Sequence, residues 1–211
     1  RFQVGKDSWS LANVRDVMWP EAWYGQFSYH VGFTFDPYLN KPYPAESPFD
    51  SADGSDFPDW PLFARAFGYD YAYQYRLGLD RDYNQIATAK WKVVKGKWGG
   101  SCSGLSIAAI LGFDNRPAVV GRYPAYPAAE DLFTVPISDS LRLVINELFQ
   151  YWHGKRHQVY VEGAWPMGPR GTLSALRESF LDELNDHRYL YIAWLNAGGG
   201  SSAHAVVPYN L

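Results

Sequence analysis

The sequence predicts an α+β fold, because helical patterns come first and strand patterns gather near the end. Apolar residues recur at helical spacing in 141–149 and 173–184, and the apolar run 105–111 is typical of a buried helix. In contrast, 189–195 is a continuous apolar run typical of a strand. Helices grouped before strands, without regular alternation, favour α+β over a series of βαβ units.

Composition limits both the size of the fold and its function. The 211 residues, 47% hydrophobic and 19% charged, suit one folded domain with a sizeable core. The net charge is -3, and acidic and basic residues are interspersed, so the sequence shows no basic stripe of the kind that binds nucleic acid. No apolar run reaches the roughly 20 residues needed to span a bilayer. We expect residues 1–57, rich in proline, to form an extension that wraps a core domain formed by 58–211.

The first regular elements are predicted around the aromatic residues. Asp59 can cap a short helix that ends at Gly68. Alternating tyrosines in 69–77 then indicate a strand. A further helix begins near Cys102 and is expected to end near Gly112.

The later elements follow from capping and periodicity. Ser138 or Ser140 can cap a second long helix, and Thr172 can open a third. Residues 158–161 suggest a strand. The glycine-rich turn 198–202 joins the strand 189–195 to the one that carries His204, so the two are expected to pair as a hairpin.

Cys102 is the one cysteine of the chain, within Gly99-Gly100-Ser101-Cys102-Ser103-Gly104. A cysteine in the first turn of a buried helix meets unpaired backbone N–H groups and the positive end of the helix dipole. Both favour the thiolate, which is the nucleophilic form. A buried structural cysteine is the commoner interpretation of such a residue taken alone.

His204 supplies the second half of the expected site. It lies in the short apolar segment His204-Ala205-Val206-Val207-Pro208-Tyr209. A cysteine at a helix start and a histidine far along the sequence is the outline of a nucleophile with its base. We therefore interpret Cys102 and His204 as catalytic.

The order of these two motifs resembles the papain-like cysteine peptidases, above all bacterial and archaeal domains with a Gly-Gly-Ser-Cys-x-Gly turn. The resemblance covers about 110 residues and is specific only at GGSCSGLS and HAVVPY. It implies a two-lobed fold, with a helical lobe carrying Cys102 and an antiparallel β lobe carrying His204. It further implies a peptide or protein substrate, hydrolysis of peptide bonds without a cofactor, and an oxyanion hole that includes the backbone N–H of Cys102.

Two positions depart from that family pattern. The family usually has a glutamine six residues before the cysteine, where this chain has Gly96. Gln85 is too far from Cys102 in the sequence to take that role. The second oxyanion donor is therefore unassigned, with the Trp98 indole N–H or a nearby backbone amide as candidates. The residue that orients the histidine is also unassigned. Asn210 would lie about 20 Å from His204 along an extended strand, so either the chain is truncated or this group comes from elsewhere.

Other interpretations of the same residues remain open. The cysteine and histidine could perform acyl transfer, as in transglutaminases, or the chain could be an inactive papain-like scaffold that binds peptide or glycan through its many aromatic residues (18%). His153 and His157 have the spacing of two zinc ligands on a helix, but Gly154 is expected to break that helix, so no metal site is predicted. The composition favours a secreted or surface-located protein.

Overall fold

The computed structural model describes residues 2–20, 35–36, 38–42, 60–75, 81–94, 99–181, 191–195 and 201–207. The chain divides into two compact units. Unit 1 comprises residues 1–13, 101–149 and 160–211, and unit 2 comprises 14–100 and 150–159. The predicted boundary near residue 57 lies outside the described residues. The described part mixes helices with short antiparallel strand pairs, as the α+β prediction requires at this coarse level.

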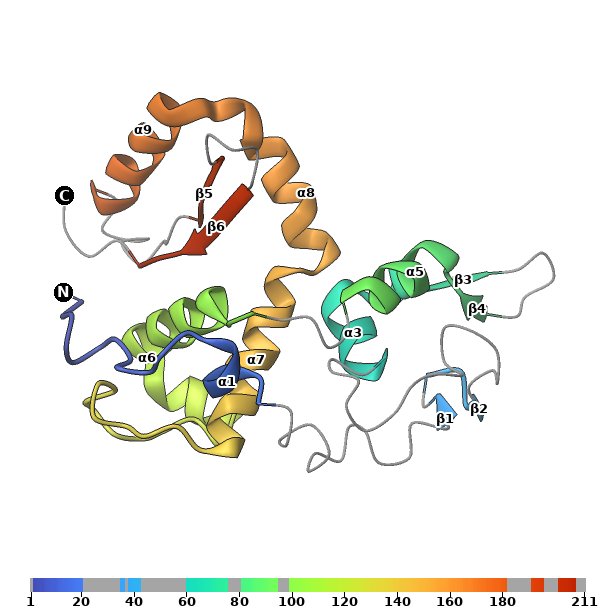
Figure 1. Ribbon diagram of the computed structural model, residues 1–211, viewed down its shortest axis with the longest axis horizontal. Helices are drawn as coiled ribbons and strands as arrows, with labels where there is room; N and C mark the ends of the chain where they lie inside the picture. Colours follow the sequence, from blue (N-terminus) through green and yellow to red (C-terminus); the bar gives the residue numbers. More distant parts are fainter. Residues whose placement is uncertain are drawn as a thin grey trace. The chain divides into compact units, whose positions relative to one another are not determined.

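Unit 1 combines helices with one hairpin (Figure 1). Strands β5 and β6 are antiparallel and pair Ile192 with His204 and Tyr191 with Ala205, so the predicted hairpin is confirmed. The elements that lie wholly or partly in this unit are α6 (Cys102–Arg122), α7 (Asp139–Trp152), α8 (Lys155–Ala164), the 3-10 helix η1 (Trp165–Met167), α9 (Gly168–Leu181), β5 (Tyr191–Leu195) and β6 (Ser201–Ala205). The end of α7 and the first half of α8, residues 150–159, belong to unit 2.

Helix α6 starts at Cys102 as predicted, and its first segment stops at a kink at Asn115, close to the predicted end near Gly112. Asn115 has a φ of -156° and a ψ of 74°, which are not helical, and a second helical segment follows to Arg122. Asn115 Oδ1 accepts a hydrogen bond from the Ala118 backbone N–H at 3.2 Å and so caps the segment beyond the kink. Gly112 also has a packing role, because an added Cβ would lie 2.0 Å from the Tyr126 hydroxyl.

Helix α7 confirms the second predicted helix. Ser138 Oγ accepts a hydrogen bond from the Leu141 N–H at 3.2 Å, which is the predicted N-cap. The whole expected apolar face is buried, namely Leu141, Val144, Ile145, Leu148 and Phe149. This face lies against α6 at Gly104, where an added Cβ would be 2.2 Å from the Ile145 carbonyl oxygen.

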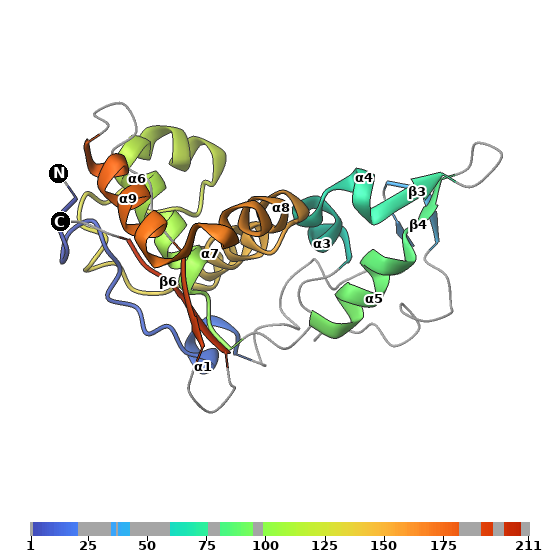
Figure 2. The ribbon, with the colours of Figure 1, turned by 90° about the horizontal axis from the view of Figure 1, so that it is seen from above.

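Unit 2 combines short helices and short strands (Figure 2), and its core consists largely of aromatic side chains. Its elements are α1 (Arg15–Met18), β1 (Phe35–Asp36), β2 (Lys41–Pro42), α3 (Trp60–Phe67), α4 (Tyr69–Ala72), β3 (Tyr73–Tyr75), β4 (Arg81–Tyr83) and α5 (Gln85–Val94). Trp60 and Trp91 are fully buried at its centre. The buried Asp36 carboxylate accepts a hydrogen bond from the Tyr73 hydroxyl at 2.9 Å, and that hydroxyl accepts one from Trp60 Nε1 at 2.9 Å.

Three predicted elements differ from the structure. Gly68 ends α3 as expected, with φ of 108°, but 69–72 form a helical turn before strand β3, so the strand prediction is wrong there. Periodicity over so few residues does not separate a strand from a turn of helix. Residues 158–161 are helical in α8, because the helix restarts after Gly154 with a Gln158 N–H to Gly154 oxygen bond of 3.1 Å. Helix α9 opens at Gly168, before Thr172.

Candidate functional site

Cys102 is the first residue of α6 and is half-buried. The first hydrogen bond of the helical ladder runs from the Leu105 N–H to the Ser101 carbonyl oxygen, at 2.9 Å. The amides of residues 102–104 therefore precede the helix's internal hydrogen bonds. Amides in this position stabilise a negative charge placed beside them.

The turn before Cys102 is fixed by two side chains. The Ser101 N–H donates to Asn13 Oδ1 at 2.6 Å, and Ser101 Oγ donates to Asn146 Oδ1 at 2.5 Å. Ser101 and Asn146 are both completely buried. These bonds tie the start of α6 to α7 and to the N-terminal segment, so the backbone that presents Cys102 is held from two sides.

Gly104 brings the two helices into direct contact next to the cysteine. Its Cα lies so close to α7 that an added Cβ would also meet Phe149 Cβ at 2.8 Å. Glycine at this position thus has a packing function that the sequence motif alone does not reveal.

The strand that carries His204 lies against α6. Ser106 Oγ donates to the Ala205 carbonyl oxygen at 3.2 Å, and Ala205 is buried. Ser106 follows Cys102 by one helical turn, about 6 Å along the axis. Figure 1 shows β6 beside α6, in agreement with the contacts between these elements.

The two side chains predicted to be catalytic come from these neighbouring elements but do not bond to one another. His204 is exposed, whereas Ala205, the next residue of β6, is buried. Successive side chains of a strand point to opposite faces, so Ala205 and not His204 faces the helix. Within the described residues, no hydrogen bond joins Cys102 to His204.

The other positions considered from the sequence contribute little to this site. Gly96, Trp98 and Asn210 lie outside the described residues. Gln85 is exposed at the start of α5, in unit 2. The second oxyanion donor and the group that orients the histidine therefore stay unassigned.

The sequence patterns did not indicate the polar residues that lie next to the turn before Cys102. Asn146 lies on the buried side of α7 although neighbouring residues of that face are apolar, and no periodic pattern distinguishes it. Ser103 is 1% exposed, and within the described part of the chain its hydroxyl has no hydrogen-bond partner. Asn13 belongs to a segment that carries no recognisable motif.

The histidines considered as metal ligands lie in unit 2. Gly154 separates α7 from α8, which confirms the predicted break in the helix between His153 and His157. Desolvation lowers the pKa of His153, as do the nearby Lys90 and His157, although the residue keeps an exposed part that solvent can reach. Among the described residues, no three His, Cys, Asp or Glu side chains group as metal ligands.

Comparisons with known proteins identify no relative of this chain. No family model, no curated protein and no solved structure matches this chain. In the part of the chain that the structure describes, no helix combines the length and apolarity required to cross a membrane.

Proposed function

We propose that the protein is a cysteine peptidase of papain-like type, with Cys102 as the nucleophile and His204 as the general base. The observation that carries this proposal is the hydrogen bond between Ser106 Oγ and the Ala205 carbonyl oxygen. This contact joins Ser106, one helical turn after Cys102, to the residue that follows His204 in the strand. Cys102 itself is half-buried at a helix N-terminus, which leaves part of it accessible to a substrate.

The chemistry follows from these residue types. His204 removes the thiol proton, and the Cys102 sulfur attacks the carbonyl carbon of a peptide bond. The Cys102 backbone N–H, which precedes the helical ladder, donates a hydrogen bond to the oxyanion. The imidazolium then protonates the leaving amine, and water hydrolyses the thioester to release the acid and the free thiol. For this step the imidazole must rotate or shift from its exposed position toward the sulfur.

The rigid backbone around Cys102 supports the same proposal. Ser101 is held by Asn13 and Asn146, so the cysteine and its amide keep their relative position when a substrate binds. A fixed donor costs no reorganisation as charge develops in the transition state.

The direct test is hydrolysis of a mixture of quenched fluorescent peptides by the full chain. We expect Cys102→Ala to abolish cleavage and His204→Gln to reduce kcat by about 100-fold or more, the range of general acid–base catalysis. His157→Gln, which replaces a histidine of unit 2, serves as the matched control and should leave kcat unchanged. Cleavage that survives Cys102→Ala would exclude Cys102 as the nucleophile.

A binding scaffold is the second candidate, favoured by the exposed position of His204 and by exposed tyrosines in unit 2. Tyr71 and Tyr75 are 47% and 68% exposed. The Arg81 guanidinium lies 5.2 Å from the Tyr75 ring centroid, an arrangement that can stack on a planar or sugar ligand. If the chain is a binding scaffold, it should cleave no peptide, and Cys102→Ala should leave glycan or peptide binding unchanged.

Adding a primary amine to the cleavage assay separates hydrolysis from acyl transfer, since transfer yields an amide product.

A further inference from the structure

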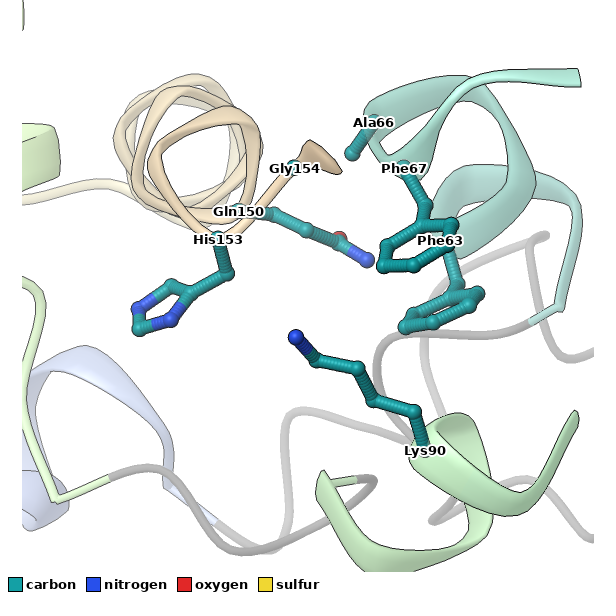
Figure 3. A pocket seen from close by; sticks show the side chains of 7 residues that line it. All are labelled: Phe63, Ala66, Phe67, Lys90, Gln150, His153 and Gly154. Atoms are coloured by element: carbon teal, nitrogen blue, oxygen red, sulfur yellow. The ribbon is translucent and has the colours of Figure 1, made fainter. Parts of the chain in front are cut away.

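Unit 2 contains a cavity of about 20 Å³ that is distinct from the residues around Cys102 (Figure 3). Helix α3 forms one wall, α5 contributes a lysine, and the end of α7 closes it. The lining residues are Phe63, Ala66, Phe67, Lys90, Gln150, His153 and Gly154.

Gln150 is the most unusual member of this cavity. It is 2% exposed, yet neither Nε2 nor Oε1 of its amide has a hydrogen-bond partner among the residues that the structure describes. Figure 3 shows the amide directed into the cavity, beside the Phe67 ring. Buried amides in folded proteins are almost always hydrogen-bonded, so an amide with both ends open indicates a missing partner.

Lys90 supplies positive charge to the same space. Its ammonium group points into the space between His153 and Gln150 in Figure 3 and lies 5.4 Å from the Phe67 ring centroid. Desolvation and the nearby Lys155 lower the pKa of Lys90, so the surroundings disfavour its charge. Within the described residues, no carboxylate forms an ion pair with Lys90. An anion in the cavity would relieve this unfavourable field.

The cavity size limits which anion fits. A single water requires about 10–15 Å³, so the cavity holds one or two water-sized atoms. The oxygen pair of a carboxylate matches that space. The rest of such a ligand would lie along Phe63 and Phe67, whose rings stack with centroids 5.2 Å apart.

We propose that this cavity binds a carboxylate with an adjacent N–H donor, as found at the C-terminal end of a peptide. The carboxylate accepts hydrogen bonds from Lys90 Nζ and Gln150 Nε2, and the adjacent N–H donates to Gln150 Oε1. A lone water could bond to the amide but carries no charge to balance that of Lys90. The proposal does not depend on Cys102 or on peptidase activity.

Calorimetric titration of the full chain with three small probes at constant ionic strength tests the proposal. N-acetylglycine carries both features, acetate lacks the N–H, and N-acetylglycinamide lacks the charge. We expect saturable binding of N-acetylglycine, about tenfold weaker binding of acetate because one buried hydrogen bond is lost, and no saturable binding of N-acetylglycinamide. Acetate binding as tightly as N-acetylglycine would overturn the role of Gln150 Oε1 and the assignment to a peptide end.

Variants identify the site. Gln150→Met and Lys90→Met should each weaken N-acetylglycine binding by about tenfold or more, since each removes a direct donor to the carboxylate. Lys92→Met, an exposed position on the same helix α5, is the matched control and should bind within about twofold of wild type. The Gln150→Met chain is expected to fold, because it removes a buried amide that has no partner. The absence of saturable carboxylate binding in wild type, or equal binding by all variants, would overturn the proposal.

Discussion

Replacing Gly104 by alanine tests how α6 and α7 position the cysteine. An added Cβ would lie 2.2 Å from the Ile145 carbonyl oxygen and 2.8 Å from Phe149 Cβ, both far inside van der Waals contact. One neighbour is backbone of α7, so the helices must separate to admit the methyl group. Overpacking of this kind costs about 3 kcal/mol, and the better helix propensity of alanine offsets about 1 kcal/mol. We expect Gly104→Ala to reduce the free energy of unfolding by about 2 kcal/mol.

Urea denaturation monitored by circular dichroism measures this difference, and α6 itself provides the control. Gly121 lies in the same helix, and an added Cβ there would meet nothing within 4 Å. Gly121→Ala should therefore raise the free energy of unfolding, by at most about 1 kcal/mol. If Gly104→Ala were as stable as wild type, the close approach of α6 and α7 beside Cys102 would be refuted.

Three further predictions concern other parts of the described structure. Gly154→Ala should destabilise the protein by about 2 kcal/mol or more, because the new Cβ would lie 2.2 Å from the Ala66 carbonyl oxygen. In the same urea assay the control Gly163→Ala should be neutral or stabilising, because a Cβ at that position would meet no atom within 4 Å. Desolvation, Lys90 and His157 lower the pKa of His153, so the unfolded chain binds a proton at this histidine more readily than the folded chain does. The contribution of His153 to stability should therefore be fully present above about pH 6.5 and fall as the pH drops toward the lowered pKa. In melting curves recorded at several pH values, His153→Gln should reduce this dependence on pH. Asn146→Leu should reduce stability by about 1–3 kcal/mol by leaving the buried Ser101 hydroxyl without its acceptor, and unchanged melting would contradict that role.

Elements with strong local signals were predictable from the sequence. The serine cap and apolar face of α7, the glycine end of α3 and the hairpin of β5 with β6 all follow from capping rules and periodicity. The errors occur where a pattern was short. Residues 69–72 alternate like a strand but form a helical turn, and residues 158–161 belong to helix α8.

For the candidate site, the sequence indicated which elements carry Cys102 and His204 but not the residues around them. Cys102 at the start of a helix could be predicted because a glycine turn precedes an apolar run. The buried bond between Ser101 and Asn146 depends on two residues 45 positions apart, and no local pattern indicates such a contact. The cavity around Gln150 was likewise missed, since it arises from three separate helices that meet in unit 2.

The rate of Cys102 alkylation by iodoacetamide at neutral pH shows whether His204 activates the Cys102 thiol. The account predicts that the native protein reacts about tenfold or more faster than its urea-unfolded form, as expected for an activated thiolate. It also predicts that His204→Gln loses this advantage while His157→Gln keeps it. Equal alkylation rates in wild type, His204→Gln and the unfolded chain would contradict the claim.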